Sequence, residues 1–306
     1  MRKVMNEHIH YICERIAVLS PIHSKKLRKN MEFFDDRYDA MADAFFKKYV
    51  GILQRDNKDL DYAIDCYLQM LADVTDETVE FLRTGKYTST TFAEVNSRVY
   101  ASPRVMEYYM HGLLMSQFLF KHHYQTLSFF IDTLPQFINT TKSYLEVGAG
   151  HGFYLSRALA ILDERTTFTV VDISETSLKF TRQFTGDNRV DYILGDIFEF
   201  DNGKKYDFIT LGEVLEHVED PLSLLLKLNS LLSDDGVLFF TTPTNAPAID
   251  HVYLFNNVEE IRDIVISAGF RIVSERSFLS EDVSAEKAEK YKIAVLFNAF
   301  LQKAGA

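Results

Sequence analysis

Hydrophobic and polar positions divide the chain into two regions with different periodicities. In residues 1–140, large apolar side chains recur at intervals of three or four residues, the spacing that gathers them on one stripe of a helix. One such series is Phe33, Phe34, Tyr38, Met41, Phe45 and Tyr49. The pattern repeats over 62–81. Only three of the chain's 13 glycines lie in residues 1–140. We therefore predict an all-helical N-terminal region.

Residues typical of helix ends support this prediction. Asp59 or Asp61 can cap the second helix, and Gly85 lies just beyond its expected end. A third helical segment opens with Ser102 and Pro103, a cap followed by proline at the first helical position.

From residue 142 the pattern changes to short apolar runs, glycine turns and amphipathic helices. Strands are expected at 143–147, 168–171, 190–194, 206–211, 237–242, 271–277 and 294–300, with helices at 156–165, 175–184, 221–232 and 258–268. Helical crossovers make the early strands parallel, whereas the last two strands have no such helix between them and should pair antiparallel. We predict an α/β fold: a Rossmann-like, doubly wound, mostly parallel seven-stranded sheet with an antiparallel last strand. The expected domains are 1–140, helical, and 141–306.

Composition excludes several classes of partner. Lys and Arg total 33 against 44 Asp and Glu, and the net charge of −11 repels nucleic acid and anionic membranes. Cys13 and Cys66 are too few for a disulfide framework. The chain shows no signal-peptide pattern and no apolar run of membrane-spanning length. We expect a cytoplasmic protein that binds neither nucleic acid nor membrane.

The sharpest local signal is a glycine-rich turn after the first predicted strand. Glu146 precedes Gly148, Gly150 and Gly152, with Ala149 between the first two glycines. Glycines at such a turn let a ligand approach the backbone and allow a positive φ. The dinucleotide fingerprint needs a third glycine where Phe153 stands, which argues against an NAD-dependent oxidoreductase. A tight turn without a ligand is the alternative reading.

Two more acidic residues follow the next strands. Asp172 closes the second strand, where a carboxylate can accept hydrogen bonds from both hydroxyls of a ribose, and Asp196 follows the third, where it can accept one from an exocyclic amine. Each alone could be a solvated turn residue or a helix cap. Together with the glycine turn they indicate one crevice at the carboxyl edge of the sheet.

With these residues the sequence resembles class I S-adenosylmethionine-dependent methyltransferases. The segment 146–152 matches the family's E/DxGxGxG motif, Asp172 its ribose-binding acid, and 195–197 its adenine-contacting segment. The run 211–221 (LGEVLEHVEDP) is similar to a stretch of the ubiquinone-biosynthesis O-methyltransferases. The resemblance covers 141–306 and does not extend to 1–140.

The resemblance implies S-adenosylmethionine as cofactor and S-adenosylhomocysteine as product. It implies in-line transfer of the methyl group, which requires donor and nucleophile to be held close together and water to be excluded. The donor-binding residues would be Glu146, Gly148, Ala149, Gly150, Gly152, Asp172, Ile173, Asp196, Ile197, Gly212 and Glu213.

Two histidines are candidates for the base that removes the acceptor's proton. His251 lies in a loop after the fifth strand, and hydrogen bonding to that loop's backbone is its alternative role. His217 follows the fourth strand and could instead anchor a turn. Tyr109 is a third catalytic candidate. We expect no metal site, because the adjacent His122 and His123 point about 100° apart on a helix.

The helical region should supply the acceptor side of the pocket. Tyr100, Met106, Tyr109 and Met110 are the candidates for contact with substrate, although an aromatic stripe at helical spacing can simply be core. We expect His151 to face solvent. The same helices could also form a homodimer interface.

The predicted activity is methyl transfer to an oxygen, nitrogen or carbon of a small-molecule metabolite, in a pocket closed by the N-terminal helices. A non-catalytic donor-binding scaffold or sensor is the alternative.

Overall fold

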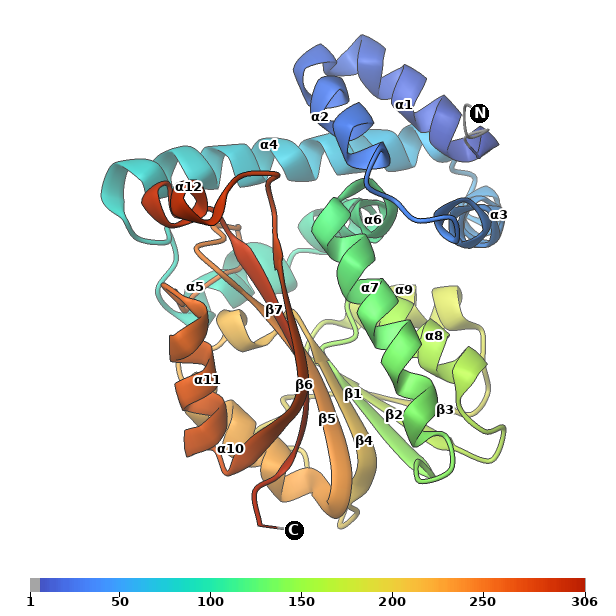
Figure 1. Cartoon of the computed structure of the whole chain (residues 1–306). Helices are drawn as coiled ribbons and strands as arrows, with labels where there is room; N and C mark the ends of the chain where they lie inside the picture. The colour runs from blue at the N-terminus through green and yellow to red at the C-terminus, as the bar shows by residue number, and fades with distance from the viewer. Residues whose placement is uncertain (1–5, 306) are drawn as a thin grey trace.

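The computed structural model describes residues 6–305. The helical region begins with α1 (Glu7–Leu19), α2 (Pro21–Met31), α3 (Tyr38–Arg55) and the long α4 (Leu60–Thr84). It continues with α5 (Phe92–Val95), η1 (Asn96–Tyr100), α6 (Pro103–Leu119), α7 (Lys121–Thr133) and η2 (Leu134–Phe137). Figure 1 shows α1 and α2 stacked on α4 at one end of the molecule, while α7 descends along one face of the sheet. The predicted helical N-terminal region is confirmed.

The remaining residues form a seven-stranded sheet in the order β3-β2-β1-β4-β5-β7-β6. Its strands are β1 (Ser143–Val147), β2 (Thr167–Asp172), β3 (Val190–Leu194), β4 (Tyr206–Gly212), β5 (Leu232–Thr244), β6 (Phe270–Leu279) and β7 (Val295–Lys303). The helices are α8 (Phe153–Ile161), α9 (Glu175–Thr185), η3 (Leu215–His217), α10 (Pro221–Leu231), α11 (Val258–Ser267) and α12 (Ala285–Lys290). β1 to β5 pair in parallel, and β7 is antiparallel to both β5 and β6. The predicted fold class is confirmed.

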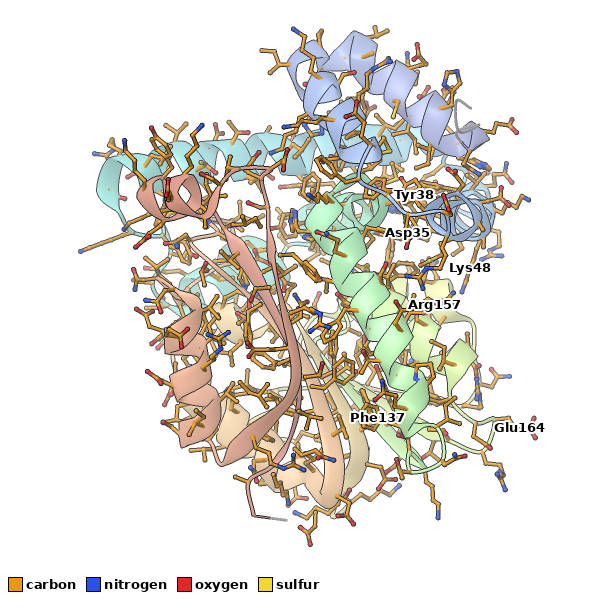
Figure 2. All side chains as sticks on the ribbon, viewed as in Figure 1. Asp35, Tyr38, Lys48, Phe137, Arg157 and Glu164 are labelled. Atoms are coloured by element: carbon orange, nitrogen blue, oxygen red, sulfur yellow. The ribbon has the colours of Figure 1, made fainter. Side chains whose placement is uncertain are left out.

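One helix starts later than its apolar series predicts. Phe33 and Phe34 precede α3 in a turn rather than continuing its stripe. The side chain of Asp35 accepts hydrogen bonds from the backbone N–H groups of Arg37 and Tyr38, both at 3.1 Å, and so holds the chain outside helical geometry until Tyr38. Asp35 and Tyr38 are labelled at this entry in Figure 2.

Two hydrophobic cores lie on opposite faces of the sheet. One lies under α10 and α11. The other joins α7, α8 and α9 to the N-terminal helices, and the ring of Phe45 on α3 lies 5.2 Å from that of Phe153 on α8. Apolar contact therefore continues across the predicted 140/141 domain boundary. The helical region is thus held directly above the carboxyl ends of the parallel strands.

None of the helices described within 6–305 is both long and apolar enough to cross a bilayer.

Candidate active site

A cavity of about 560 Å³ lies where α6 passes over the carboxyl ends of the parallel strands. Ten of the predicted donor residues line it: Glu146, Gly148, Ala149, Gly150, Asp172, Ile173, Asp196, Ile197, Gly212 and Glu213. The same cavity is lined by the acceptor candidates Tyr100, Met106, Tyr109 and Met110, and by both candidate bases, His217 and His251. Tertiary structure thus brings the residues singled out in both regions of the chain to one place.

Glycine is required at three positions of the turn after β1, for different physical reasons. All three have positive φ, at 65°, 53° and 70° for Gly148, Gly150 and Gly152. A Cβ on Gly148 would lie 2.6 Å from Val214, and one on Gly152 would lie 2.7 Å from Thr181. A Cβ on Gly150 would meet no atom nearer than Met110 Sδ, at 3.7 Å, so this position leaves open space beside the turn. Gly152 does not line the cavity, so its contribution is close packing of the turn rather than contact with a ligand.

Asp172 organises the glycine turn from the end of β2. Its carboxylate accepts hydrogen bonds from Gly150 N at 3.3 Å, Ser174 N at 2.8 Å and Ser177 Oγ at 2.7 Å. Burial raises the pKa of Asp172 and these donors partly offset that rise. Because the side chain also lines the cavity, it can hold the turn and still present oxygen to a ligand.

The segment after β3 forms a small ledge on the cavity. Asp196 is exposed and accepts from Phe198 N at 2.9 Å, whereas Ile197 is buried. Phe198 is 39% exposed and lines the cavity. An exposed phenyl ring here offers a flat stacking surface, which was not predicted because the sequence does not show that this side chain reaches the cavity.

Glu146 is buried on β1 and receives a hydrogen bond from the hydroxyl of Tyr144. Burial raises the pKa of Glu146 to about 8, despite this bond. The carboxyl group is therefore largely protonated at neutral pH. In that form it can donate a hydrogen bond as well as accept one.

Beyond β4 the backbone bends sharply beside the cavity. Glu213 has φ of 55°, a strained value for a residue with a side chain, and it is held there by hydrogen bonds with Thr241. Gly212 precedes it, and a Cβ there would lie 3.0 Å from the ring of Tyr154. Burial raises the pKa of Glu213 well above its ordinary value, and the nearby Glu216 adds to this rise.

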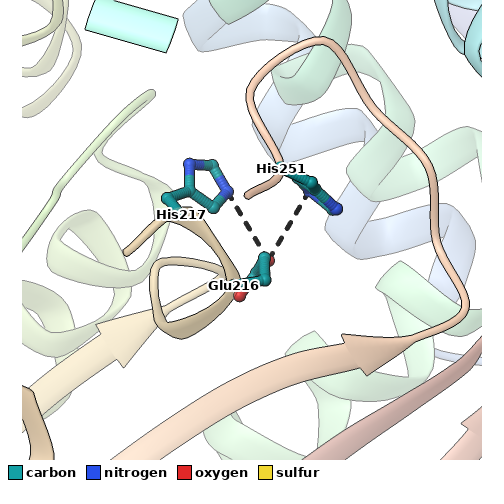
Figure 3. Close-up of side chains that lie close together, drawn as sticks. All are labelled: Glu216, His217 and His251. Carbon is teal, nitrogen blue, oxygen red and sulfur yellow. Dashed lines mark ion pairs between the residues drawn. The ribbon is translucent and has the colours of Figure 1, made fainter. Parts of the chain in front are cut away.

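A cluster of acids and imidazoles lies beside the cavity, and Figure 3 shows three of its members, Glu216, His217 and His251. Glu216 Oε1 lies 3.6 Å from His217 Nε2 and 3.8 Å from His251 Nε2. Asp250 Oδ2 lies 3.5 Å from His217 Nδ1. The hydroxyl of Tyr100 bonds to the same Nδ1, and the hydroxyl of Tyr109 donates to Asp250 at 3.1 Å. Glu216 and Asp250, which contact the predicted bases, were not predicted from the sequence.

These neighbours give the two histidines opposite charge states. Burial lowers the pKa of His217, but Asp250, Glu216 and Glu213 together raise it to about 9. Burial lowers the pKa of His251 below its ordinary value, and Glu216 only partly opposes this effect. At neutral pH His217 is therefore an imidazolium and His251 a neutral imidazole.

A backbone carbonyl fixes the tautomer of His251. Its Nδ1 lies 2.6 Å from the carbonyl oxygen of Ala246, which can only accept, so the ring proton is on Nδ1. Nε2 then carries the free lone pair, on the side of Glu216. The loop-anchoring role expected as the alternative for His251 is confirmed, and it leaves the other ring nitrogen available as a base.

Within residues 6–305, Glu216, His217 and His251 form the set whose ligand atoms could hold a metal ion, all lying within 4.8 Å of one another. His217 would first have to lose its proton, because its pKa is raised. This set was not found from the sequence, which drew attention to His122 and His123 instead.

His151 departs from its predicted position. Its side chain is half-buried and lines the cavity, so the expectation that it faces solvent is wrong. The backbone N–H of Phe153 donates to His151 Nδ1 at 3.2 Å and holds the ring inside the turn. A side chain's direction in such a turn depends on local hydrogen bonds that residue spacing does not show.

Comparison with known proteins decides the family. A family model described as a methyltransferase domain matches residues 120–281, more than half of the chain. The chain belongs to this methyltransferase domain family. The predicted enzyme class, a methyltransferase, and the predicted cofactor, S-adenosylmethionine, agree with this family.

Curated relatives match a shorter segment. A ubiquinone biosynthesis O-methyltransferase from Actinobacillus pleuropneumoniae serotype 5b is 38% identical over 109 residues, which are 33% of this chain and 45% of that protein. One from Nitrosomonas europaea is 32% identical over 110 residues, covering 35% and 46% of the two chains. The methyltransferase chain thus spans about half the length of the curated relatives it matches.

Among solved structures, the mitomycin 7-O-methyltransferase MmcR is similar with a TM-score of 0.52 and 13% identity. The match covers 76% of this chain and 68% of that one. At this identity the likeness shows the fold alone.

Proposed function

We propose that this methyltransferase transfers the methyl group of S-adenosylmethionine to a hydroxyl group of an uncharged small molecule, with His251 accepting the hydroxyl proton. The observation that carries the proposal is a neutral imidazole, with Nε2 unprotonated, on a residue that lines the same cavity as the glycine turn. A base must be unprotonated and within reach of the acceptor to act.

The donor would lie along the carboxyl ends of β1 to β4. The glycine turn leaves room for its methionine part beside Gly150, Asp172 accepts from the ribose, and Asp196 with Ile197 borders the adenine. Phe198 adds a stacking surface. The donor would supply an electrophilic methyl carbon, and the backbone at Gly212 and Glu213, which lines the cavity, would border its sulfonium.

The charge of the cavity restricts the acceptor. Seven carboxyl groups line it: Glu146, Asp172, Asp196, Glu213, Glu219, Asp220 and Asp250. Its described lining residues include no lysine or arginine. Even with the raised pKa values of Glu146 and Glu213 and the imidazolium of His217 on this lining, the remaining acidic side chains attract a positively charged sulfonium and repel an anionic acceptor. The printed names of the curated relatives, O-methyltransferases, favour oxygen as the atom methylated.

The acceptor side is apolar and aromatic. Tyr100, Tyr109, Met106 and Met110 are partly or fully buried and lie on or beside α6, over the strand ends. Tyr109 and Tyr100 are tied by hydroxyl bonds to Asp250 and His217, so their rings are fixed as walls rather than free to rotate. These residues would position a flat acceptor and exclude water. A hydroxyl on an aromatic ring fits this wall.

During transfer the acceptor oxygen forms a bond to the methyl carbon as the carbon–sulfur bond breaks, and the electron pair stays on sulfur. The hydroxyl proton goes to His251 Nε2. The single imidazolium of His217 lies beside two carboxylates, Glu216 and Asp250, so the proton taken up by His251 meets a surrounding of net negative charge. The N-terminal helices would form the lid over the cavity. A homodimer through these helices stays a prediction.

The test is product formation with a labelled donor. The purified chain is incubated with methyl-labelled S-adenosylmethionine and a panel of neutral phenols and catechols, matched carboxylate-bearing phenols, and amines. We expect S-adenosylhomocysteine and a labelled methyl ether from neutral phenols only. Donor binding without product from any acceptor fraction would indicate a scaffold, and methylation of the anionic phenols or the amines would overturn the acceptor class.

Replacing Asp172 with alanine should weaken donor binding by about 1–3 kcal/mol, because a buried hydrogen-bond acceptor is lost. Calorimetric titration with S-adenosylhomocysteine measures the change. Since Asp172 also holds the turn through Gly150, Asp172→Asn provides the comparison: it keeps one oxygen acceptor and should lose less affinity. Wild-type affinity in Asp172→Ala would remove the residue from the donor site.

A further inference from the structure

A polar cluster at the glycine-turn end of the cavity has no role in the chemistry described above. Gln117 on α6, His123 on α7 and His151 in the turn all line the cavity there. Gln117 is 6% exposed, and its Oε1 has no hydrogen-bond partner among the described residues. A buried amide oxygen without a hydrogen-bond donor is unfavourable unless a ligand satisfies it.

The nitrogen atom of the Gln117 amide already has a hydrogen-bond partner within α6. Its Nε2 donates to the carbonyl oxygen of Leu113, one turn earlier on α6, at 3.4 Å. This contact assigns Oε1 as the atom left over. Gln117 Oε1 can therefore accept a hydrogen bond from a ligand.

The neighbouring serine fixes the tautomer of His123. Ser116 Oγ lies 2.7 Å from the carbonyl oxygen of Leu113, so the serine proton is used there. The contact of 2.8 Å between Ser116 Oγ and His123 Nδ1 then needs the proton of Nδ1. Burial lowers the pKa of His123 well below its ordinary value, so the ring is neutral and its Nε2 is a hydrogen-bond acceptor.

His151 presents the opposite polarity. Its Nδ1 accepts from Phe153 N, and burial lowers its pKa to about 4, so the neutral ring carries its proton on Nε2. The cluster thus offers two acceptors, Gln117 Oε1 and His123 Nε2, and one donor, His151 Nε2. An α-amino acid has the matching groups, an ammonium with three donors and a carboxylate that only accepts.

We propose that Gln117, His123 and His151 recognise the ammonium and carboxylate of the donor's methionine part: Gln117 and His123 accept from the ammonium, and His151 donates to the carboxylate. The inference rests on the proposed function. Among residues 6–305, no lysine or arginine lines the cavity, so neutral donors serve the carboxylate, while the ammonium adds a second positive charge that suits the acidic cavity.

The experiment compares two ligands that differ only at this end. S-Adenosylhomocysteine carries the amino-acid group, and 5′-methylthioadenosine lacks it. With Gln117→Met, which keeps the side chain's length and removes its polar atoms, calorimetry should show about tenfold or more loss of affinity for S-adenosylhomocysteine and unchanged affinity for 5′-methylthioadenosine. Gln125→Met is the matched control: Gln125 is on α7, half-buried, and lines a different cavity.

Equal losses for both ligands, or no loss for either, would overturn the proposal. A second measurement needs no variant: wild-type protein should bind the deaminated analogue of S-adenosylhomocysteine at least about tenfold more weakly than the parent, since the analogue is anionic and leaves both acceptors unsatisfied. Equal binding of the analogue would also overturn it. If wild-type protein binds neither S-adenosylhomocysteine nor 5′-methylthioadenosine, the proposed function itself fails.

Discussion

Replacing His251 with alanine is expected to slow methyl transfer by about 10²-fold or more, with donor affinity close to that of the wild type. The residue lines the cavity and carries a neutral imidazole with Nε2 unprotonated, and alanine leaves no group there to take the hydroxyl proton. Turnover under saturating donor and acceptor measures the effect. Calorimetric titration with S-adenosylhomocysteine checks that the donor site survives.

His251→Asn separates the two roles of this side chain. An asparagine amide can still donate to the carbonyl oxygen of Ala246 and so hold the loop, but it cannot act as a base. We expect it to be as slow as His251→Ala and more stable. His10→Ala, at an exposed histidine of α1, is the control for the loss of an imidazole.

The pH profile of the wild-type enzyme gives a separate measurement of the same role. Because burial lowers the pKa of His251, the enzyme should remain active at pH 6.5 and lose activity only as the pH falls through that lowered pKa, where the ring takes up a proton. A wild-type rate for His251→Ala across the whole pH range would exclude His251 from the mechanism.

Replacing Glu146 with glutamine should remove a large pH dependence of stability. The pKa of Glu146 is raised by burial from 4.5 in the unfolded chain to about 8 in the folded protein. A raised folded pKa contributes stability that is fully present below pH 4.5 and is lost as the pH rises towards 8. At about 1.4 kcal/mol per pKa unit, the loss amounts to several kcal/mol.

Urea denaturation at pH 5 and pH 8 measures this effect. The free energy of unfolding of the wild type should fall between these values by several kcal/mol more than that of Glu146→Gln, whose amide stays neutral. The comparison is made between variants because His217, with its own raised pKa of about 9, adds a loss of stability towards high pH in both. Glu286→Gln, at an exposed glutamate of α12, should behave as wild type. Parallel losses in wild type and Glu146→Gln would contradict the raised pKa.

Local sequence determined the order of helices and strands. Apolar spacing reports which face of a segment is buried, and this is a property of neighbours in the chain, so the helical region and all seven strands could be predicted. The glycine turn and the acids at strand ends were predictable for a similar reason: the carboxyl ends of parallel strands meet at one edge, so Glu146, Asp172 and Asp196 had to approach each other.

Spacing along the chain does not determine what a side chain meets across the fold. Gly152 matches the motif, yet it packs against Thr181 and does not line the cavity. His151 turns inward because the backbone N–H of Phe153 donates a hydrogen bond to its ring.

The charge states of the two candidate bases were decided by tertiary structure alone. The sequence places His217 and His251 in separate loops, with nothing to distinguish them. Only in the folded chain does Asp250 lie beside His217, and Ala246 bind Nδ1 of His251. A pKa depends on burial and on charges a few ångströms away, wherever they come from in the chain. The sequence therefore determined which histidines could act, and only the tertiary structure decided which of them is neutral.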